Sequence, residues 1–223
     1  MELEKPIQHE AVPKKELLPA PGRGQYDRKQ TKEVREEEQI VRLLDSTMSV
    51  MVREGYAGTT VSKICEQAGM SRATFYGHFS GIKPALLALH DRVGNTVYDH
   101  IEEKSTGIED PFERLREGVI GFMEIIADNP NEARVIFREI RSAGPAYENH
   151  REEQLQRYVE RLMNDATRAF DDGYISRPPN EDVIYSLIAG MEAVAMRYVS
   201  KNRAHEVQQA VPALVELVMR ALM

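Results

Sequence analysis

The sequence predicts an all-α fold, with an N-terminal three-helix domain containing a helix-turn-helix and a larger C-terminal helical domain. Three observations lead to this class. Apolar residues recur at three- and four-residue intervals through most of the 223 residues, as on one face of a helix. No run of useful length alternates apolar and polar residues as a half-buried strand does. Proline follows Asp110, Asn129 and Gly144 at the start of three periodic segments, where it fits a first helical turn.

Composition places the chain among soluble globular proteins. Hydrophobic residues make up 42% of it and charged residues 29%, values typical of folded soluble domains. No apolar run approaches the length that crosses a bilayer, and the N-terminus lacks the basic-then-apolar order of a signal peptide. The single cysteine, Cys65, excludes an intrachain disulfide and agrees with a reducing compartment. We therefore expect a cytoplasmic protein without a membrane partner.

The net charge of −7 leaves nucleic-acid binding open. Phosphate contacts depend on where lysines and arginines lie rather than on their total number. Between residues 23 and 83 basic residues roughly balance acidic ones, and the excess negative charge lies in the later two-thirds of the chain. This distribution predicts a bipolar molecule with one end suited to DNA.

Residues 1–30 contain several prolines and glycines and show no helical or strand period. We interpret them as a flexible N-terminal arm. Arg23, Arg28 and Lys29 would reach an adjacent minor groove if this arm acts as some DNA-binding arms do. The simpler interpretation is a solvated tail.

A long helix is predicted from about Lys32 to Gly55. Its buried stripe follows helical spacing and consists of Ile40, Leu43, Leu44, Thr47 and Met51. Residues 56–58 then form a turn into the next helix. The stripe supplies the platform on which the following two short helices pack.

Two short helices, Val61 to Ala68 and Arg72 to Tyr76, are predicted next, joined by a tight turn at Gly69-Met70. Thr60 and Ser71 precede them, and a hydroxyl there accepts from backbone N–H groups that a first helical turn leaves unpaired. Gly69 supplies the left-handed residue that ends the first of these helices.

The apolar residues of these helices lie on the sides that face the platform. Val61, Ile64 and Ala68 share one face of the first helix, and Phe75 and Phe79 anchor the second. The polar side left free carries Arg72, Thr74, Tyr76, Gly77 and His78. This arrangement predicts a helix-turn-helix whose second helix enters a DNA major groove.

The run TTVSKICEQAGMSRATFYGHF, residues 59–79, resembles the DNA-binding domain of TetR-family transcriptional regulators. A TT-hydrophobic start, an AG-hydrophobic-S turn and a Y-x-H-F ending recur together in that family. The resemblance assigns residues 31–82 to the DNA-binding domain and 83–223 to an effector-binding and dimerisation domain. In the family a lysine usually follows the H-F pair by three residues. Here Ser80, Gly81 and Ile82 intervene before Lys83, an apparent one-residue insertion.

The resemblance implies a dimeric repressor that binds a palindromic operator in double-stranded DNA and is released by an apolar small-molecule effector. Three alternatives stay open. The regulator could act as an activator, the chain could be a helical small-molecule-binding protein whose DNA end is vestigial, or the scaffold could process a small molecule as an enzyme.

The candidate DNA-binding residues lie on and around the second short helix. Arg72 and Thr74 are placed for base edges or phosphates, and Ala73 and Gly77 are small enough to let the backbone approach. By resemblance, Tyr76 and His78 match the phosphate-contacting pair of the family. The full predicted set is Thr60, Lys63, Ser71, Arg72, Ala73, Thr74, Tyr76, Gly77, His78 and Lys83. The plain alternative for each residue is a solvated helix face.

The C-terminal domain is predicted to begin with a helix from Ile82 towards Glu103, with Pro84 in its first turn. After a break at residues 105–107, helices start at Pro111, Pro130 and Pro145. The last two helices are predicted at Glu181 to Ser200 and Ala204 to Leu222, the latter kinked by Pro212.

We interpret the segment from Glu181 to Leu222 as the homodimer interface. Ser186, Gly190 and Ala193 form a row of small side chains that lets another helix come close. The last helix carries more apolar surface than one neighbour within the chain needs. Pairing about a two-fold axis would bury this surface in a four-helix arrangement. The alternative is that both are ordinary core helices of a monomer.

The effector cavity that the resemblance implies would lie among the fifth to eighth helices. Large apolar side chains there suit an adaptable pocket, although any single one more simply fills the core. The candidate ligand-binding residues are Phe122, Met123, Ile126, Phe137, Tyr158, Leu162, Met163, Phe170, Tyr185 and Met191, with Met196 beside them. Arg134, Arg138 and Arg141 would pair with an acidic head group or lie on solvated surface.

No pattern for catalysis or metal binding stands out. The six histidines form no H-x-x-x-H pair and none lies at metal-ligand spacing from Cys65. G-x-S-x-G, Walker and G-x-G-x-x-G patterns are absent from the sequence. We therefore expect no metal, no cofactor and no enzymatic activity, and we interpret Cys65 as a small buried hydrophobe rather than a redox switch.

Overall fold

The computed structural model describes residues 32–223, so the predicted arm at residues 1–30 lies outside the described residues. Over residues 32–223 the chain is helical and has no strand, which confirms the all-α prediction. In chain order the elements are α1 (Lys32–Gly58), α2 (Val61–Ala68), α3 (Arg72–His78), α4 (Ile82–Ser105), α5 (Pro111–Asp128), α6 (Pro130–Phe137), η1 (Glu139–Ala143), α7 (Pro145–Asp171), α8 (Glu181–Ser200), η2 (Ala204–Ala210) and α9 (Val211–Leu222).

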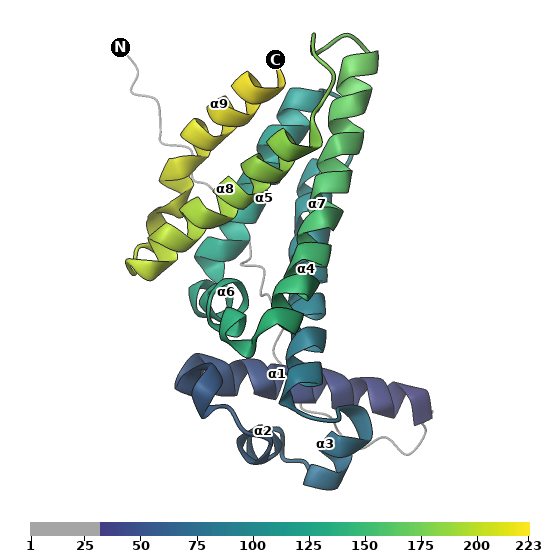
Figure 1. The fold of residues 1–223 in the computed structure, drawn as a ribbon, viewed down its shortest axis with the longest axis vertical. Coiled ribbons are helices and arrows are strands. Elements are labelled where there is room, and N and C mark those ends of the chain that lie inside the picture. Colours follow the sequence, from purple (N-terminus) through teal and green to yellow (C-terminus); the bar gives the residue numbers. More distant parts are fainter. Residues whose placement is uncertain (1–31) are drawn as a thin grey trace, which may run out of the picture.

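The helices form two groups on opposite sides of α1 (Figure 1). α1 lies across one end of the molecule, with α2 and α3 on its outer side. α4 begins beside α3 and extends, together with α7, towards the far end of the molecule. The segment that joins α7 to α8 lies at that far end, so it is the part of the larger group most distant from α3.

One apolar core joins the two groups. Leu43 of α1 and Phe75 of α3 belong to the same cluster of buried side chains as Ile126 of α5 and Val207 of η2. A second, smaller cluster lies between α7, α8 and α9 and includes Val159. The first cluster therefore packs α1 directly against the larger group of helices.

An ion pair also ties α4 to α1. Arg92 donates to the Oδ1 atom of Asp45 at 2.7 Å and to the backbone carbonyl of Val41 at 3.2 Å. Burial raises the pKa of Asp45, and the neighbouring guanidinium of Arg92 opposes that rise. The pair fixes the angle between α1 and α4 because a guanidinium donates along fixed directions.

The structure differs from the sequence prediction at Pro212 and at Gly55. The predicted helix from Ala204 to Leu222 is divided into η2 and α9, and Pro212 lies in the first turn of α9 instead of kinking a longer helix. Proline has no N–H to donate, so it is tolerated best where the helix begins. We expected Gly55 to end the first helix. It interrupts α1 instead, with a φ of 70°, and α1 continues beyond it to Gly58.

α8 is apolar along much of its length. Among the helices of residues 32–223 it is the one long and apolar enough to cross a membrane, judged by length and composition alone. Only 28% of that stretch is buried within the monomer. The buried side chains of α8 are Ile184, Leu187, Ala195 and Val199.

Candidate DNA-binding surface and ligand cavity

The turn between α2 and α3 is held by the predicted caps. The side chain of Thr60 accepts a hydrogen bond from the N–H of Lys63, and the side chain of Ser71 accepts one from the N–H of Thr74. Gly69 adopts the left-handed conformation with φ of 62°, and its N–H donates to the carbonyl of Glu66. These local interactions, all confirmed, fix the angle between α2 and α3.

Two aromatic side chains dock α3 onto the rest of the molecule. Phe75 is fully buried and Phe79 nearly so, with ring centroids 5.8 Å apart. Ile64 and Ala68 of α2 are buried in the same core. Because Phe75 points inwards, its neighbour Tyr76 points outwards and is 50% exposed.

Most of the predicted DNA-binding residues lie on the surface. The exposed ones are Thr60, Ser71, Arg72, Ala73, Tyr76, Gly77 and Lys83. A Cβ atom added at Gly77 would meet no neighbouring atom, so this side of α3 is open to close approach by another molecule. The Thr74 hydroxyl is half-buried and bonds to the Ser71 hydroxyl at 2.9 Å, which makes it part of the cap.

Two other predicted residues have partners within the protein. The ammonium of Lys63 contacts Glu54 and donates to the carbonyl of Gly58 at 3.0 Å. The hydrogen bond from Lys63 holds the pKa of the Glu54 carboxyl below its ordinary value. His78 bonds through Nε2 to the Oε1 atom of Gln39 at 2.9 Å, which ties the end of α3 to α1. Nothing in the sequence pattern pointed to Gln39 or Glu54 as partners.

Cys65 lies beneath the turn. Its side chain is buried, its thiol contacts the carbonyl of Ser71 at 3.7 Å, and burial raises the pKa of the thiol. A thiol held in its neutral form packs as a small hydrophobe.

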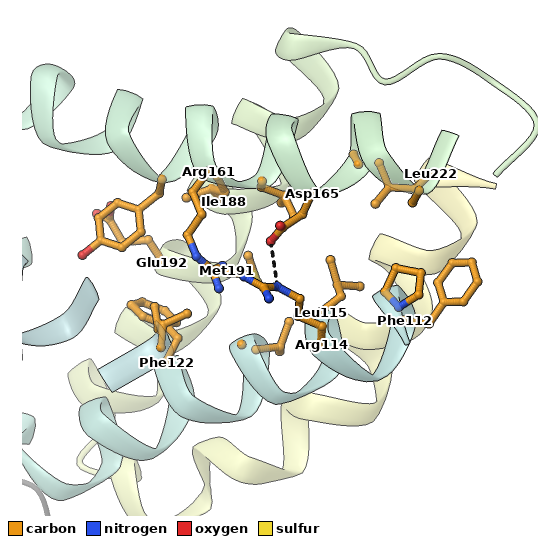
Figure 2. A pocket seen from close by; sticks show the side chains of 18 of the residues that line it. Phe112, Arg114, Leu115, Phe122, Arg161, Asp165, Ile188, Met191, Glu192 and Leu222 are labelled. Atoms are coloured by element: carbon orange, nitrogen blue, oxygen red, sulfur yellow. Dashed lines mark hydrogen bonds and ion pairs between the residues drawn. The ribbon is translucent and has the colours of Figure 1, made fainter. Parts of the chain in front are cut away.

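A separate, apolar cavity of about 130 Å³ lies among α4–α9. Figure 2 shows its length, with Phe112 and Leu222 at one end and Phe122 and Glu192 at the other. Helices from distant parts of the chain supply the walls, so the cavity exists only when α4, α5, α7 and α8 are packed together. Its mostly apolar lining suits an apolar ligand.

Half of the predicted ligand-binding residues line this cavity, namely Phe122, Phe137, Tyr158, Leu162 and Met191. Met123 and Ile126 are fully buried in the main core instead. Met123 lies about 100° further round α5 than Phe122, and this rotation directs it into the main core. The remaining predicted residues lie outside the lining: Met163 packs on the second core, Phe170 is 36% exposed and Tyr185 donates to Glu152.

Charged side chains also line the cavity. Arg114 and Asp165 form an ion pair at 3.3 Å across its middle (Figure 2). Arg161 contacts Glu102 and donates to the hydroxyl of Ser105 at 2.7 Å. Sequence reasoning did not select these residues, because arginine and aspartate are seldom buried unless they are paired.

Tyr158 contributes its ring to the cavity while its hydroxyl is engaged elsewhere. The hydroxyl donates to the backbone carbonyl of Gly94 at 2.9 Å, and burial raises the pKa of Tyr158 above its ordinary value. The side chain is thus an apolar wall whose position is fixed by α4.

The exposed side of α8 and α9 carries small and apolar side chains beside the exposed ion pair of Arg220 with Glu216. Val183 is 38% exposed and Leu217 is 53% exposed. Ser186 and Ala193 are exposed as well, and a Cβ atom at Gly190 would meet nothing within 4 Å. Ala195 and Val199, on the opposite side of α8, are buried within the chain. α8 therefore has one side packed internally and another left open.

Comparisons with known proteins match both halves of the chain. Residues 43–88 match a family model described as bacterial regulatory proteins, tetR family, and residues 109–222 match one described as tetracyclin repressor-like, C-terminal domain.

Solved structures share the fold at low sequence identity. The fatty acid degradation regulator FadR from Bacillus halodurans is 21% identical with a TM-score of 0.72, over 80% of this chain and 93% of that one. FadR from Bacillus subtilis, solved in complex with stearoyl-CoA, is 21% identical with a TM-score of 0.72, over 79% and 95% of the two chains. A TetR-family protein from Syntrophomonas wolfei is 18% identical with a TM-score of 0.73, over 84% and 96%.

Proposed function

The chain belongs to the TetR family of transcriptional regulators, and from that premise we propose that it is a homodimeric repressor in the cytoplasm. In this proposal the dimer binds a palindromic operator and leaves it when an apolar effector occupies the cavity among α4–α9. The observation that carries the proposal is the open side of α3, which presents Arg72, Ala73, Tyr76 and Gly77 to solvent while Phe75 and Phe79 anchor the helix from beneath.

The exposed side of α3 suits the major groove for chemical reasons. Arg72 can donate two hydrogen bonds to a guanine edge, and Tyr76 can contact a phosphate. The absence of a side chain at Gly77 allows the duplex to come close to the helix backbone. Lys63 and His78 have internal partners, so we assign them to positioning α2 and α3.

The open side of α8 and α9 supports pairing of two subunits. A two-fold axis beside Ala193 and Leu217 would bury the small and apolar side chains that one chain leaves exposed. This accounts for the low burial of α8 in the monomer. A dimer of helix-turn-helix domains reads half-sites about 34–36 Å apart, one duplex turn.

The cavity supports an effector with a long apolar chain. Its walls are largely aliphatic and aromatic, and it extends from Leu222 to Phe122. FadR from Bacillus subtilis, which shares the fold, was solved with stearoyl-CoA. An acyl chain is therefore the ligand class that we propose for the cavity.

Communication between the cavity and DNA would pass through α4. Val97 and Ile101 of this helix line the cavity, while Arg92 of the same helix holds Asp45 of α1. A ligand that moves α4 therefore changes the position of the domain that carries α3. By linkage, the effector weakens DNA binding only as much as DNA weakens effector binding.

The DNA-binding proposal is tested with an operator selected from a library of random duplexes. Arg72→Ala, measured by fluorescence anisotropy, is expected to weaken binding about 5- to 150-fold, because a good base contact contributes about 1–3 kcal/mol. Combining it with Tyr76→Ala weakens binding further. Both side chains are exposed, so the melting temperature stays within about 2 °C of wild type.

Arg177→Ala is the matched control. It also removes an exposed positive charge, but its segment between α7 and α8 lies at the far end of the molecule from α3 (Figure 1). Its operator affinity is expected to equal that of wild type. Unchanged binding by the double variant, or one subunit per palindromic operator in sedimentation, contradicts the proposal.

A further inference from the structure

A second concave site, which we call the arginine basin, lies on the surface next to the cavity. Four arginines line it, Arg138 at the end of α6, Arg141 in η1, Arg151 in α7 and Arg197 in α8. The volume of this open basin is about 450 Å³. Glu192 is the one carboxylate in its lining among the described residues.

The charges of the basin are only partly neutralised. Arg141 and Arg151 both donate to Glu192, at 3.1 and 2.9 Å. Arg138 donates to the hydroxyl of Ser200, a neutral partner. Within residues 32–223 no carboxylate pairs with Arg138 or Arg197. Four guanidinium groups therefore share one internal carboxylate, with Glu148 reaching Arg141 from outside at 3.9 Å.

The arginines inside the apolar cavity differ from those of the basin. Arg114 pairs with Asp165, and Arg161 pairs with Glu102. Their charges are balanced, and a ligand anion there would have to break an existing ion pair. An anionic group is therefore favoured in the basin and not between the cavity walls.

The two sites share part of their lining. Phe137 and Glu192 belong to both. Figure 2 places Glu192 at the Phe122 end of the cavity, so this end adjoins the basin. A chain lying along the cavity from Leu222 would reach the arginines where it leaves the apolar walls.

We propose that the arginine basin binds the phosphate-bearing head group of an amphiphilic effector whose apolar chain occupies the cavity, an inference that rests on the proposed effector function. A single carboxylate would leave most of the basin charge unneutralised, whereas a head group with several phosphate oxygens can engage several arginines in bidentate hydrogen bonds. The basin shares Ala193 with the open side of α8, so it opens beside the proposed dimer interface.

The test uses the full-length dimer with three ligands, stearoyl-CoA, stearate and coenzyme A, measured by isothermal titration calorimetry. Wild type is expected to bind stearoyl-CoA at least tenfold more tightly than stearate. The double variant Arg138→Ala/Arg197→Ala is expected to lose at least tenfold in affinity for stearoyl-CoA and to lose less in affinity for stearate, whose single carboxylate engages fewer arginines. Higher salt should weaken stearoyl-CoA binding in wild type more than in the variant.

Arg168→Ala/Arg177→Ala is the control pair, because both arginines are exposed and lie outside the two linings. It should bind all three ligands as wild type does. The inference is overturned if Arg138→Ala/Arg197→Ala binds stearoyl-CoA as tightly as wild type, if wild type binds stearate equally well, or if wild type binds none of the ligands.

An operator-release assay separates this inference from the proposed function. If stearate alone releases the operator and the head group adds nothing, the basin assignment fails while the regulator with an apolar effector stands. If stearoyl-CoA binds through the basin but operator affinity stays unchanged, the basin assignment stands and the proposed release mechanism fails.

Discussion

The side chains that we propose to contact DNA project outwards from one short helix. The side chains that line the cavity are instead enclosed by six helices. α3 positions Arg72 and Tyr76 through neighbours a few residues away, including the Ser71 cap and the Phe75 anchor. The cavity brings together Phe122 and Met191, which come from different helices. The first surface depends on local interactions, and the second depends on how long helices are rotated against one another.

This difference also governs what a ligand can do at each end. DNA can dock on a surface that is already formed, since Tyr76 and Gly77 are exposed before any partner arrives. Val97 of α4 lines the cavity and also belongs to the main core, so we expect a ligand larger than the cavity to displace packed walls. We therefore expect ligand binding at the cavity to change the packing of the helices, and DNA binding at α3 to use a surface that is already formed.

The largest expected effect tests whether the DNA-binding end depends on a single anchor. Phe75→Ala removes a fully buried ring beneath α3 and is expected to cost about 3–5 kcal/mol of stability. Operator binding should be lost while the cavity still binds its ligand. Denaturant unfolding, operator anisotropy and ligand calorimetry measure the three effects. Loss of both binding activities would show that the two ends are one cooperative unit.

A smaller effect is expected from pH at a buried histidine of the larger helical group, outside the cavity lining. His90 of α4 packs against Tyr147 and His150, with ring centroids 5.1 and 5.4 Å apart. Burial, followed by the charges of His150 and Arg151, lowers the pKa of His90 to about 3. Its ordinary value is about 6.5, so below that pH the unfolded chain binds a proton that the folded protein does not.

Stability is therefore expected to fall as pH drops from 6.5 towards 3, by about 2 kcal/mol at pH 5 from this residue. His90→Leu removes the titrating group, so its stability should depend less on pH over that range. Urea unfolding of wild type and variant at pH 7 and pH 5 measures the difference. Equal losses of stability in both proteins would show that His90 does not titrate as its burial requires.

The smallest expected effect tests the local hydrogen bond that begins α3. Ser71→Ala removes the cap that accepts from the N–H of Thr74 and is expected to cost about 1 kcal/mol. Operator affinity should fall less than for Arg72→Ala, because the Arg72 side chain proposed to contact a base is kept. Ser62→Ala, an exposed serine within α2, is the matched control and should leave stability unchanged. Thermal unfolding that gives equal midpoints for both variants would contradict the role of the cap.

The sequence alone determined the helical class and the helix-turn-helix, because both follow from interactions within one or two turns. The three- and four-residue period predicts helices. Thr60 specifies where α2 begins, Gly69 where it ends and Ser71 where α3 begins. The predicted kink at Pro212 was wrong. This proline lies in the first turn of α9, since a proline can start a helix as well as kink one.

Only the tertiary structure decided which side chains are available for binding. Gln39 engages His78 and Glu54 engages Lys63, while Arg114 and Asp165 meet inside the cavity. The arginine basin likewise combines residues from α6, η1, α7 and α8. The physical reason is that a helical period fixes the face on which a residue lies, whereas the neighbour of that face depends on helices far away in the chain.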